Sequence, residues 1–155
     1  MERREFIALI GMAAAAMPQR ASAEPHAPGS IAGQLVGTWS YVSSVATRKD
    51  GSTFDRWGPN PHGIFIFDRS GNYSQIIVGS ESRVFGSKTF CAFGTYTVDE
   101  TKRILVTKIE ASSTTKLAGV SQNRDILLLT QNEMKYSNPL LTSNAIAEVL
   151  WKRIG

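Results

Sequence analysis

Few side chains in this sequence are of the kinds that carry out chemistry on their own. The chain of 155 residues has two histidines, His26 and His62, and a single cysteine, Cys91. These three are too far apart in the sequence to resemble a zinc-binding cluster. The sequence also contains neither a Gly-x-Ser-x-Gly nucleophile motif nor a glycine-rich phosphate loop. We therefore predict no metal, no cofactor and no catalytic residue that a motif would define.

The remaining candidates are aromatic and polar side chains within short apolar runs. Aromatic walls with a few polar groups are the usual lining of a small-molecule site. Arg124 is the residue that we expect to meet an anion or a carbonyl group of such a ligand. Each candidate could instead be ordinary core or point outward, because strand alternation defines two faces without saying which one is inward. The candidate ligand-binding residues are Tyr41, Phe65, Tyr73, Gln75, Tyr96 and Arg124.

Eight short runs of β-forming residues must position these candidates. Turn residues such as Asp50-Gly51-Ser52, Gly58 to Gly63 and Asp68 to Asn72 separate the runs. No helical pattern alternates with them, which argues against folds built from β-α-β units. The expected strands are residues 36–46, 63–68, 73–78, 90–98, 103–112, 125–130, 133–136 and 147–154, and the polar stretch 79–88 could form a short helical lid.

The short connections between these runs predict a closed sheet. Strands joined by consecutive hairpins lie side by side, and an open sheet of this length would expose two edges. Closure removes both edges. We therefore predict an all-β fold, an eight-stranded antiparallel up-and-down barrel, with an interior just wide enough for side chains or one small ligand. If Trp39 faces inward in its strand, alternation places Tyr41 and Ser43 inward too.

The first residues follow the order of a targeting signal. Arg3-Arg4-Glu5-Phe6-Ile7 is similar to the twin-arginine export motif, and an uncharged apolar run extends from Ile7 to Met17. That run is too short to cross a bilayer, which takes about 20 residues. Ala21-Ser22-Ala23 supplies the small residues of a cleavage site, and this order favours a signal over a buried amphipathic helix. We predict a twin-arginine signal peptide at 1–23, a flexible lead-in at 24–33, a barrel domain at 34–155, and a periplasmic or secreted location.

Several motifs of the barrel region follow the order of a known family. They are Leu35-Val36-Gly37-Thr38-Trp39, Trp57 to Gly63, Gly71-Asn72-Tyr73-Ser74, Phe93-Gly94-Thr95-Tyr96 and Trp151-Lys152-Arg153. In these motifs the chain resembles the bacterial lipocalin-like domain family, which are small calycin-type barrels. The resemblance implies that Trp39 plugs one end of the barrel and that Arg153 packs across its ring, a cation–π contact of about 0.5–2 kcal/mol. The connection 79–89 is shorter than the family pattern.

Composition and charge limit the range of partners. The net charge of +4 comes without a dense basic run, so we do not expect nucleic acid as a partner. No run after the predicted signal is long enough for a membrane helix. We expect the barrel to bind a small hydrophobic or amphipathic molecule. One alternative is a cofactor-independent enzyme, an isomerase or cyclase that uses a tyrosine or His62 as acid–base group. Another is a filled barrel, whose cavity would be below about 300 Å³.

Overall fold

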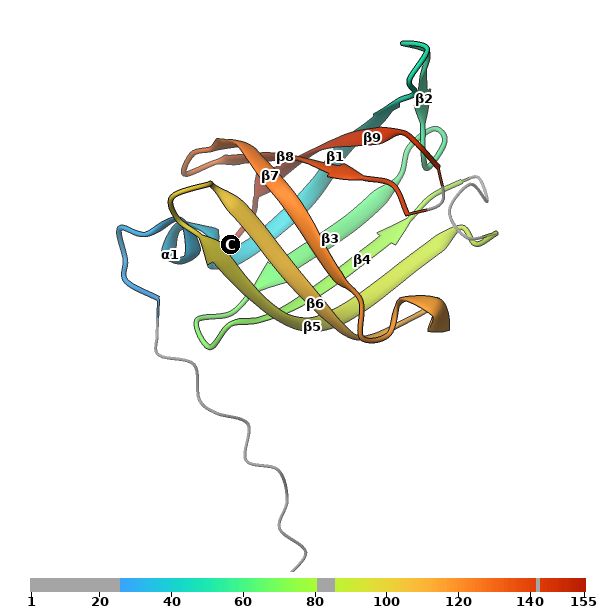
Figure 1. The fold of residues 1–155 in the computed structure, drawn as a ribbon. Helices are drawn as coiled ribbons and strands as arrows, with labels where there is room; N and C mark the ends of the chain where they lie inside the picture. The colour runs from blue at the N-terminus through green and yellow to red at the C-terminus, as the bar shows by residue number, and fades with distance from the viewer. Residues whose placement is uncertain (1–25, 81–85, 142) are drawn as a thin grey trace, which may run out of the picture.

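A computed structural model describes residues 26–80, 86–141 and 143–155, which form a β-barrel with one short α-helix at its end (Figure 1). Every strand pairing in the barrel is antiparallel. None of the described helices has the length and apolar character needed to cross a membrane. The elements are α1 (Ile31–Leu35), β1 (Gly37–Thr47), β2 (Thr53–Asp55), β3 (His62–Phe67), β4 (Asn72–Val78), β5 (Thr89–Asp99), β6 (Ile104–Ser112), the 3₁₀ helix η1 (Thr115–Leu117), β7 (Ser121–Leu129), β8 (Glu133–Pro139) and β9 (Ile146–Arg153).

Strand β1 closes the barrel because it pairs with strands from both ends of the sheet. Its first residues, Gly37 to Ser40, pair with β3, and most of its length pairs with β9. The strands from β3 to β9 follow one another in sequence order. Strand β2 pairs only with the far end of β1 and stands outside the closed ring. The predicted eight-stranded up-and-down barrel is therefore confirmed.

The strand positions agree with the sequence analysis to within a few residues, with some differences. β7 begins at Ser121 and not at residue 125, because Gln122 and Arg124 continue its ladder with β6. Three elements were not expected: α1, which begins inside the predicted lead-in, β2 and η1. The predicted signal peptide lies outside the described residues, as do residues 81–85 of the predicted lid. The described residues of 79–88 contain no helix.

Aromatic side chains fill the end of the barrel next to α1. Trp39, Phe65 and Trp151 are completely buried, and the ring centroids of Phe65 and Trp151 are 5.3 Å apart. Trp39 Nε1 donates a hydrogen bond of 2.9 Å to the Leu35 carbonyl at the end of α1. The Arg153 guanidinium lies 4.1 Å from the centroid of the Trp39 ring. The predicted contact of Arg153 with Trp39 is confirmed, and the pair closes this end together with α1.

A β-bulge in β1 decides which of its residues enter the interior. Trp39 and Tyr41 are both buried, as alternation requires. The pairing with β9 then shifts between Tyr41 and Ser43, so that Ser44 and Ala46 become the buried residues. The prediction that Ser43 shares the inward face is therefore wrong, because a bulge inserts one residue and reverses the alternation. The shift brings the Ser44 hydroxyl into the barrel.

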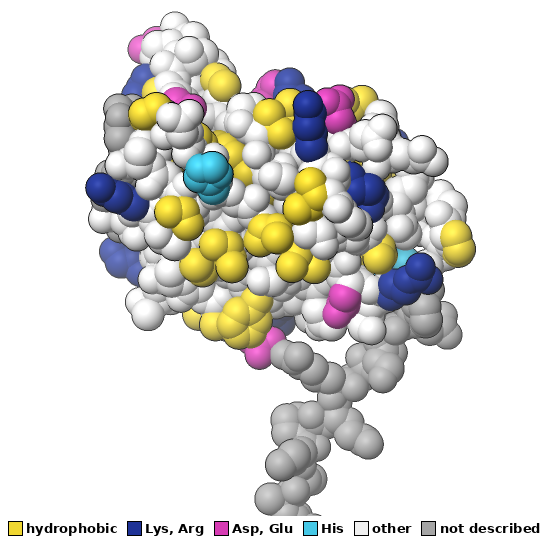
Figure 2. All heavy atoms as spheres, turned by 180° about the vertical axis from the view of Figure 1, so that it is seen from behind, with side chains coloured by type: hydrophobic (Ala, Val, Ile, Leu, Met, Phe, Trp, Pro, Cys, Tyr) yellow, Lys and Arg dark blue, Asp and Glu magenta, His cyan; other side chains and the backbone are white. Residues whose placement is uncertain are grey.

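Apolar side chains also occur on the outside of the barrel, and they gather on the face seen in Figure 2. Strands β3 and β4 carry exposed residues such as Ile66, Ile76 and Val78. These residues alternate with the inward-facing Phe65 and Gln75 of the same strands. Both faces of β3 are therefore largely apolar, which explains why its residues read as one continuous apolar run in the sequence.

Candidate functional site

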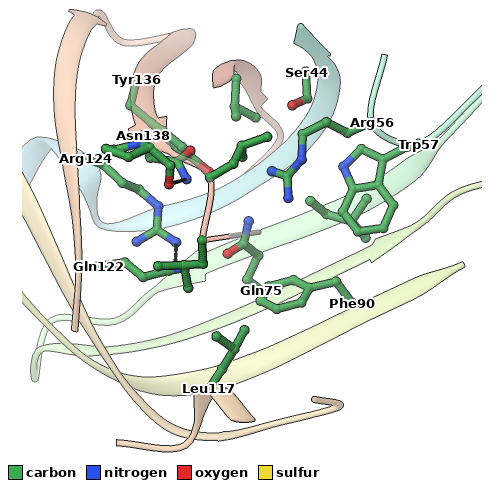
Figure 3. Close-up of a pocket in the computed structure, with 15 residues that line it drawn as sticks. Ser44, Arg56, Trp57, Gln75, Phe90, Leu117, Gln122, Arg124, Tyr136 and Asn138 are labelled. Atoms are coloured by element: carbon green, nitrogen blue, oxygen red, sulfur yellow. Dashed lines mark hydrogen bonds between the residues drawn. The ribbon is translucent and has the colours of Figure 1, made fainter. Parts of the chain in front are cut away.

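The end of the barrel opposite α1 holds a small cavity between the strands (Figure 3). Its volume is about 40 Å³. One water needs about 10–15 Å³ by this kind of measure. A drug-sized ligand needs about 300 Å³ or more. The cavity therefore has room for a few waters or for the head group of a ligand, and side chains fill the rest of the barrel.

The cavity is lined by polar side chains on the strands and by apolar side chains near the connections. Polar side chains come mainly from the strands, where inward-facing positions hold serine, glutamine, asparagine and arginine. Apolar side chains come mainly from strand ends and from the connections after β2, β6 and β8. The polar lining residues are Ser44, Arg56, Gln75, Gln122, Arg124, Tyr136 and Asn138, and the apolar ones include Trp57, Ile77, Phe90, Leu117, Leu140 and Leu141.

Arg124 is a deeply buried cation on β7, with only 3 % of its surface exposed. One terminal nitrogen donates to the Thr107 hydroxyl, and the other donates to Gln122 Oε1 at 2.7 Å. The guanidinium lies 5.4 Å from the ring centroid of Tyr136. Its Nε has no hydrogen-bond partner. In the described part of the chain no carboxylate pairs with it, so its charge is met by neutral groups alone.

Arg56 brings a second guanidinium to the same cavity from the connection after β2. The Asp55 carboxylate accepts the backbone N–H groups of Trp57 and Gly58, at 2.7 Å and 3.0 Å, which turns the chain there. Gly58 completes the turn with φ of +75°, a conformation that favours glycine. Figure 3 shows the Arg56 side chain directed into the cavity. No hydrogen bond or ion pair joins it to any described residue.

The two arginines influence each other electrostatically. Burial lowers the pKa of Arg56 because removal from water disfavours the charged form, and the nearby Arg124 acts in the same direction. An arginine nevertheless remains charged at any physiological pH. The cavity therefore holds two positive charges, and the described residues that line it include neither aspartate nor glutamate.

Several polar atoms around the cavity are buried without a partner. They are Ser44 Oγ, Trp57 Nε1, Gln75 Oε1 and Arg124 Nε. Leaving a buried donor or acceptor unpaired costs about 1–3 kcal/mol. Four such atoms around one small space are the arrangement expected where a polar molecule binds. Figure 3 shows the Gln75 amide between the guanidinium groups of Arg56 and Arg124.

The six candidates from the sequence are all buried in the barrel, and the structure separates them into two groups. Gln75 and Arg124 line the cavity. Tyr41, Phe65 and Tyr73 belong to the aromatic core. Burial raises the pKa of both Tyr41 and Tyr73, so these hydroxyls stay protonated.

Tyr96, the sixth candidate, lies toward the closed end of the barrel and not at the cavity. Its hydroxyl donates to the Asp68 carbonyl at 2.8 Å, and its ring centroid is 4.9 Å from that of Phe67. Sequence reasoning missed Arg56 and Ser44. Arg56 follows the unexpected strand β2, and only the bulge turns Ser44 inward; the glycine-rich turn after Asp55 is the one sequence signal that pointed to a special conformation near Arg56.

The two histidines and the cysteine are not among the residues that line this cavity. His62 is exposed and is not part of the lining. Cys91 is partly exposed and unpaired as a thiol. Among residues 26–80, 86–141 and 143–155, no three His, Cys, Asp or Glu side chains come together as a metal site. The described groups that line the cavity and could contact a polar molecule are cationic or neutral.

Comparison with known proteins gives a likeness of fold alone. No family model matches the chain, and no curated protein matches it. The chain is similar to a solved structure described as a redesigned β-barrel, with 16% sequence identity and a TM-score of 0.47. The match covers 80% of this chain and 95% of that one. The fold assignment rests on the strand pairing itself.

Proposed function

We propose that this chain is an exported, lipocalin-like binding protein that holds a small amphipathic molecule at the end of the barrel opposite α1. The observation that carries the proposal is the cavity between Gln75, Arg56 and Arg124, where unpartnered polar atoms face a space of about 40 Å³. A polar head group in this space would supply the missing hydrogen bonds.

The apolar part of the ligand would lie toward the connections. The cavity is too small to hold a whole drug-sized molecule, so the body of the ligand must extend outward past Trp57 and Phe90. Leu141, on the connection after β8, lines the same cavity and is 54% exposed. Covering such apolar surface stabilises a complex by about 25 cal/mol for each Å² removed from water. A polar interior and an apolar rim together favour an amphipathic ligand over a purely apolar one.

A feature of the sequence supports the export part of the proposal, and a contact in the structure supports the family part. The Arg3-Arg4 pair, the apolar run after it and the Ala21-Ser22-Ala23 triplet follow the order of a twin-arginine signal. The contact of Trp39 with Arg153 is the one that the lipocalin-like resemblance implies. Replacing both arginines by lysine, R3K/R4K, should leave the uncut precursor in the cytoplasm, whereas the native chain should be found outside it in shortened form. Equal export of both chains would refute the twin-arginine assignment.

Binding is tested on the exported protein by native mass spectrometry and by titration calorimetry. We expect a co-purifying small molecule, or saturable binding of one equivalent from a set of eight-carbon probes: octanoate, octanamide, octanol and octyl phosphate. If no molecule co-purifies and none of the four probes binds at millimolar concentration, the barrel is a filled one and the proposed function is wrong.

A further inference from the structure

We propose that the head group bound in this cavity is a carboxylate, held between the guanidinium groups of Arg56 and Arg124. This inference rests on the proposed function, because it names the chemical class of the molecule that the barrel binds. It makes the protein a binder of small amphipathic carboxylic acids, and it assigns Arg56, which comes from a connection outside the closed ring, to the ligand site.

The positive charges of Arg56 and Arg124 have no opposite charge among the described residues that line the cavity. Taking an ion out of water costs several kcal/mol unless an opposite charge and hydrogen bonds replace the solvent. Only 3% of the surface of Arg124 is exposed, and its two hydrogen-bond acceptors, Thr107 and Gln122, are both neutral. Arg56 has no acceptor among the described residues. Among the described residues the cavity has two cations and no anion, so we expect the ligand to supply the anion.

The side chains of Arg56 and Arg124 point into the same cavity. Figure 3 shows both guanidinium groups reaching into the cavity from separate walls, with the Gln75 amide between them. Guanidinium groups are planar and present parallel N–H donors that match the two oxygens of a carboxylate. Arg124 Nε has no hydrogen-bond partner, and the Arg56 donors have none among residues 26–80, 86–141 and 143–155. Ser44 Oγ and Trp57 Nε1 add two unpartnered donors around the same space.

Size and charge favour one kind of head group over the others. An amide or alcohol head group would leave both positive charges unpaired, and a cationic one would be repelled. A phosphate or sulfate has the right sign, but its tetrahedral group carries three or more oxygens into a space of about 40 Å³. A carboxylate is planar, has two oxygens that together accept about four hydrogen bonds, and would place a negative charge beside both guanidinium groups.

Titration calorimetry on the exported protein tests this assignment with the same four eight-carbon probes, which share one alkyl chain and differ in the head group. We expect octanoate to bind at least tenfold more tightly than octanamide, octanol or octyl phosphate. In R56Q and R124Q the affinity for octanoate should fall at least tenfold while that for octanamide stays within about threefold. R69Q is the matched control, because Arg69 is exposed in the hairpin at the other end of the barrel, and it should bind octanoate like the native protein.

Each other outcome is informative. If octanamide or octanol binds as tightly as octanoate, the carboxylate inference is wrong while the binding function stands. Tighter binding of octyl phosphate would overturn the choice of carboxylate. Octanoate binding that neither R56Q nor R124Q weakens would refute the assigned site. Failure of all four probes would refute the proposed function together with this inference. Should R124Q not fold, as judged by circular dichroism, the partly buried R56Q carries the test by itself.

Discussion

Replacing Arg153 by methionine would test whether the end of β9 holds the closed end of the barrel together. The Arg153 guanidinium lies 4.1 Å from the Trp39 ring centroid. It also donates hydrogen bonds of 2.5 Å, 2.7 Å and 2.6 Å to the carbonyl groups of Gln34, Val36 and Gln131. Methionine keeps an apolar stem against the ring but has none of these donors. The variant therefore removes one cation–π contact and three hydrogen bonds at once.

The expected loss follows from these contacts. A cation–π contact at a partly exposed site contributes about 0.5–1 kcal/mol. An ordinary hydrogen bond contributes about 0.5–1.5 kcal/mol, and two of the three are at exposed positions where water can replace the donor. We therefore expect R153M to lower the free energy of unfolding by about 3 kcal/mol. For a domain of this size that corresponds to a fall in Tm of about 10 °C.

Denaturant and thermal unfolding, followed by tryptophan fluorescence, would measure this loss. K152M is the matched control, because Lys152 is the exposed neighbour on the same strand and its loss should change the free energy of unfolding by less than about 0.5 kcal/mol. R153K should fall between the two, since lysine keeps the charge but lacks the planar group. If R153M and K152M unfold together, Arg153 does not hold this end of the barrel and the reasoning is refuted.

Three further substitutions test other parts of the structure. Burial would raise the pKa of Asp68, but hydrogen bonds from Asn72 and neighbouring backbone outweigh it and lower the pKa. The Asp68 carboxylate therefore stabilises the fold above its unfolded pKa of about 4, and this contribution is lost as the pH falls through the folded pKa. In urea unfolding, D68N should be less stable than the native protein at pH 7 and should lose stability less steeply below pH 4. Parallel stability curves for the two proteins would contradict this. In G94A the new Cβ would overlap a backbone carbonyl oxygen of β6, so we expect the free energy of unfolding to fall by about 3 kcal/mol. G29A is the control: nothing lies within 4 Å of the new Cβ there, so this variant should melt like the native protein. E100Q weakens the two hydrogen bonds that the carboxylate accepts from the first N–H groups of α1 and should cost about 1 kcal/mol in equilibrium unfolding; unchanged amide exchange in α1 would count against that role.

The barrel could be predicted because its signals are local. Turn residues such as Asp68 to Asn72 mark strand ends directly in the sequence, and alternation between them marks the strands. Helix α1 could not be predicted in this way, since five residues are too few for a helical pattern. It depends on a cap from Ser30 and on Glu100, which is 69 residues away from Ile31.

Only the part of the candidate site that lies within regular strands could be predicted from the sequence. Gln75 and Arg124 stand out in the sequence because they are polar residues within apolar strands. Arg56 lies among polar residues of a connection, where an arginine is ordinarily solvated, and only the tertiary fold turns it into the cavity. Regular alternation from Trp39 and Tyr41 would point Ser44 outward, and only the bulge in β1 turns it inward.

The pairing of β1 with β9 also affects how the chain folds during synthesis. β1 and β9 are the first and last strands of the barrel, so ring closure must wait until the ribosome has made every strand between them. Until then the β9-facing edge of β1 is unpaired, and an unpaired edge invites association with other chains. Contacts over such long sequence separations also form slowly. The nascent chain is therefore most exposed to aggregation just before its last strand emerges.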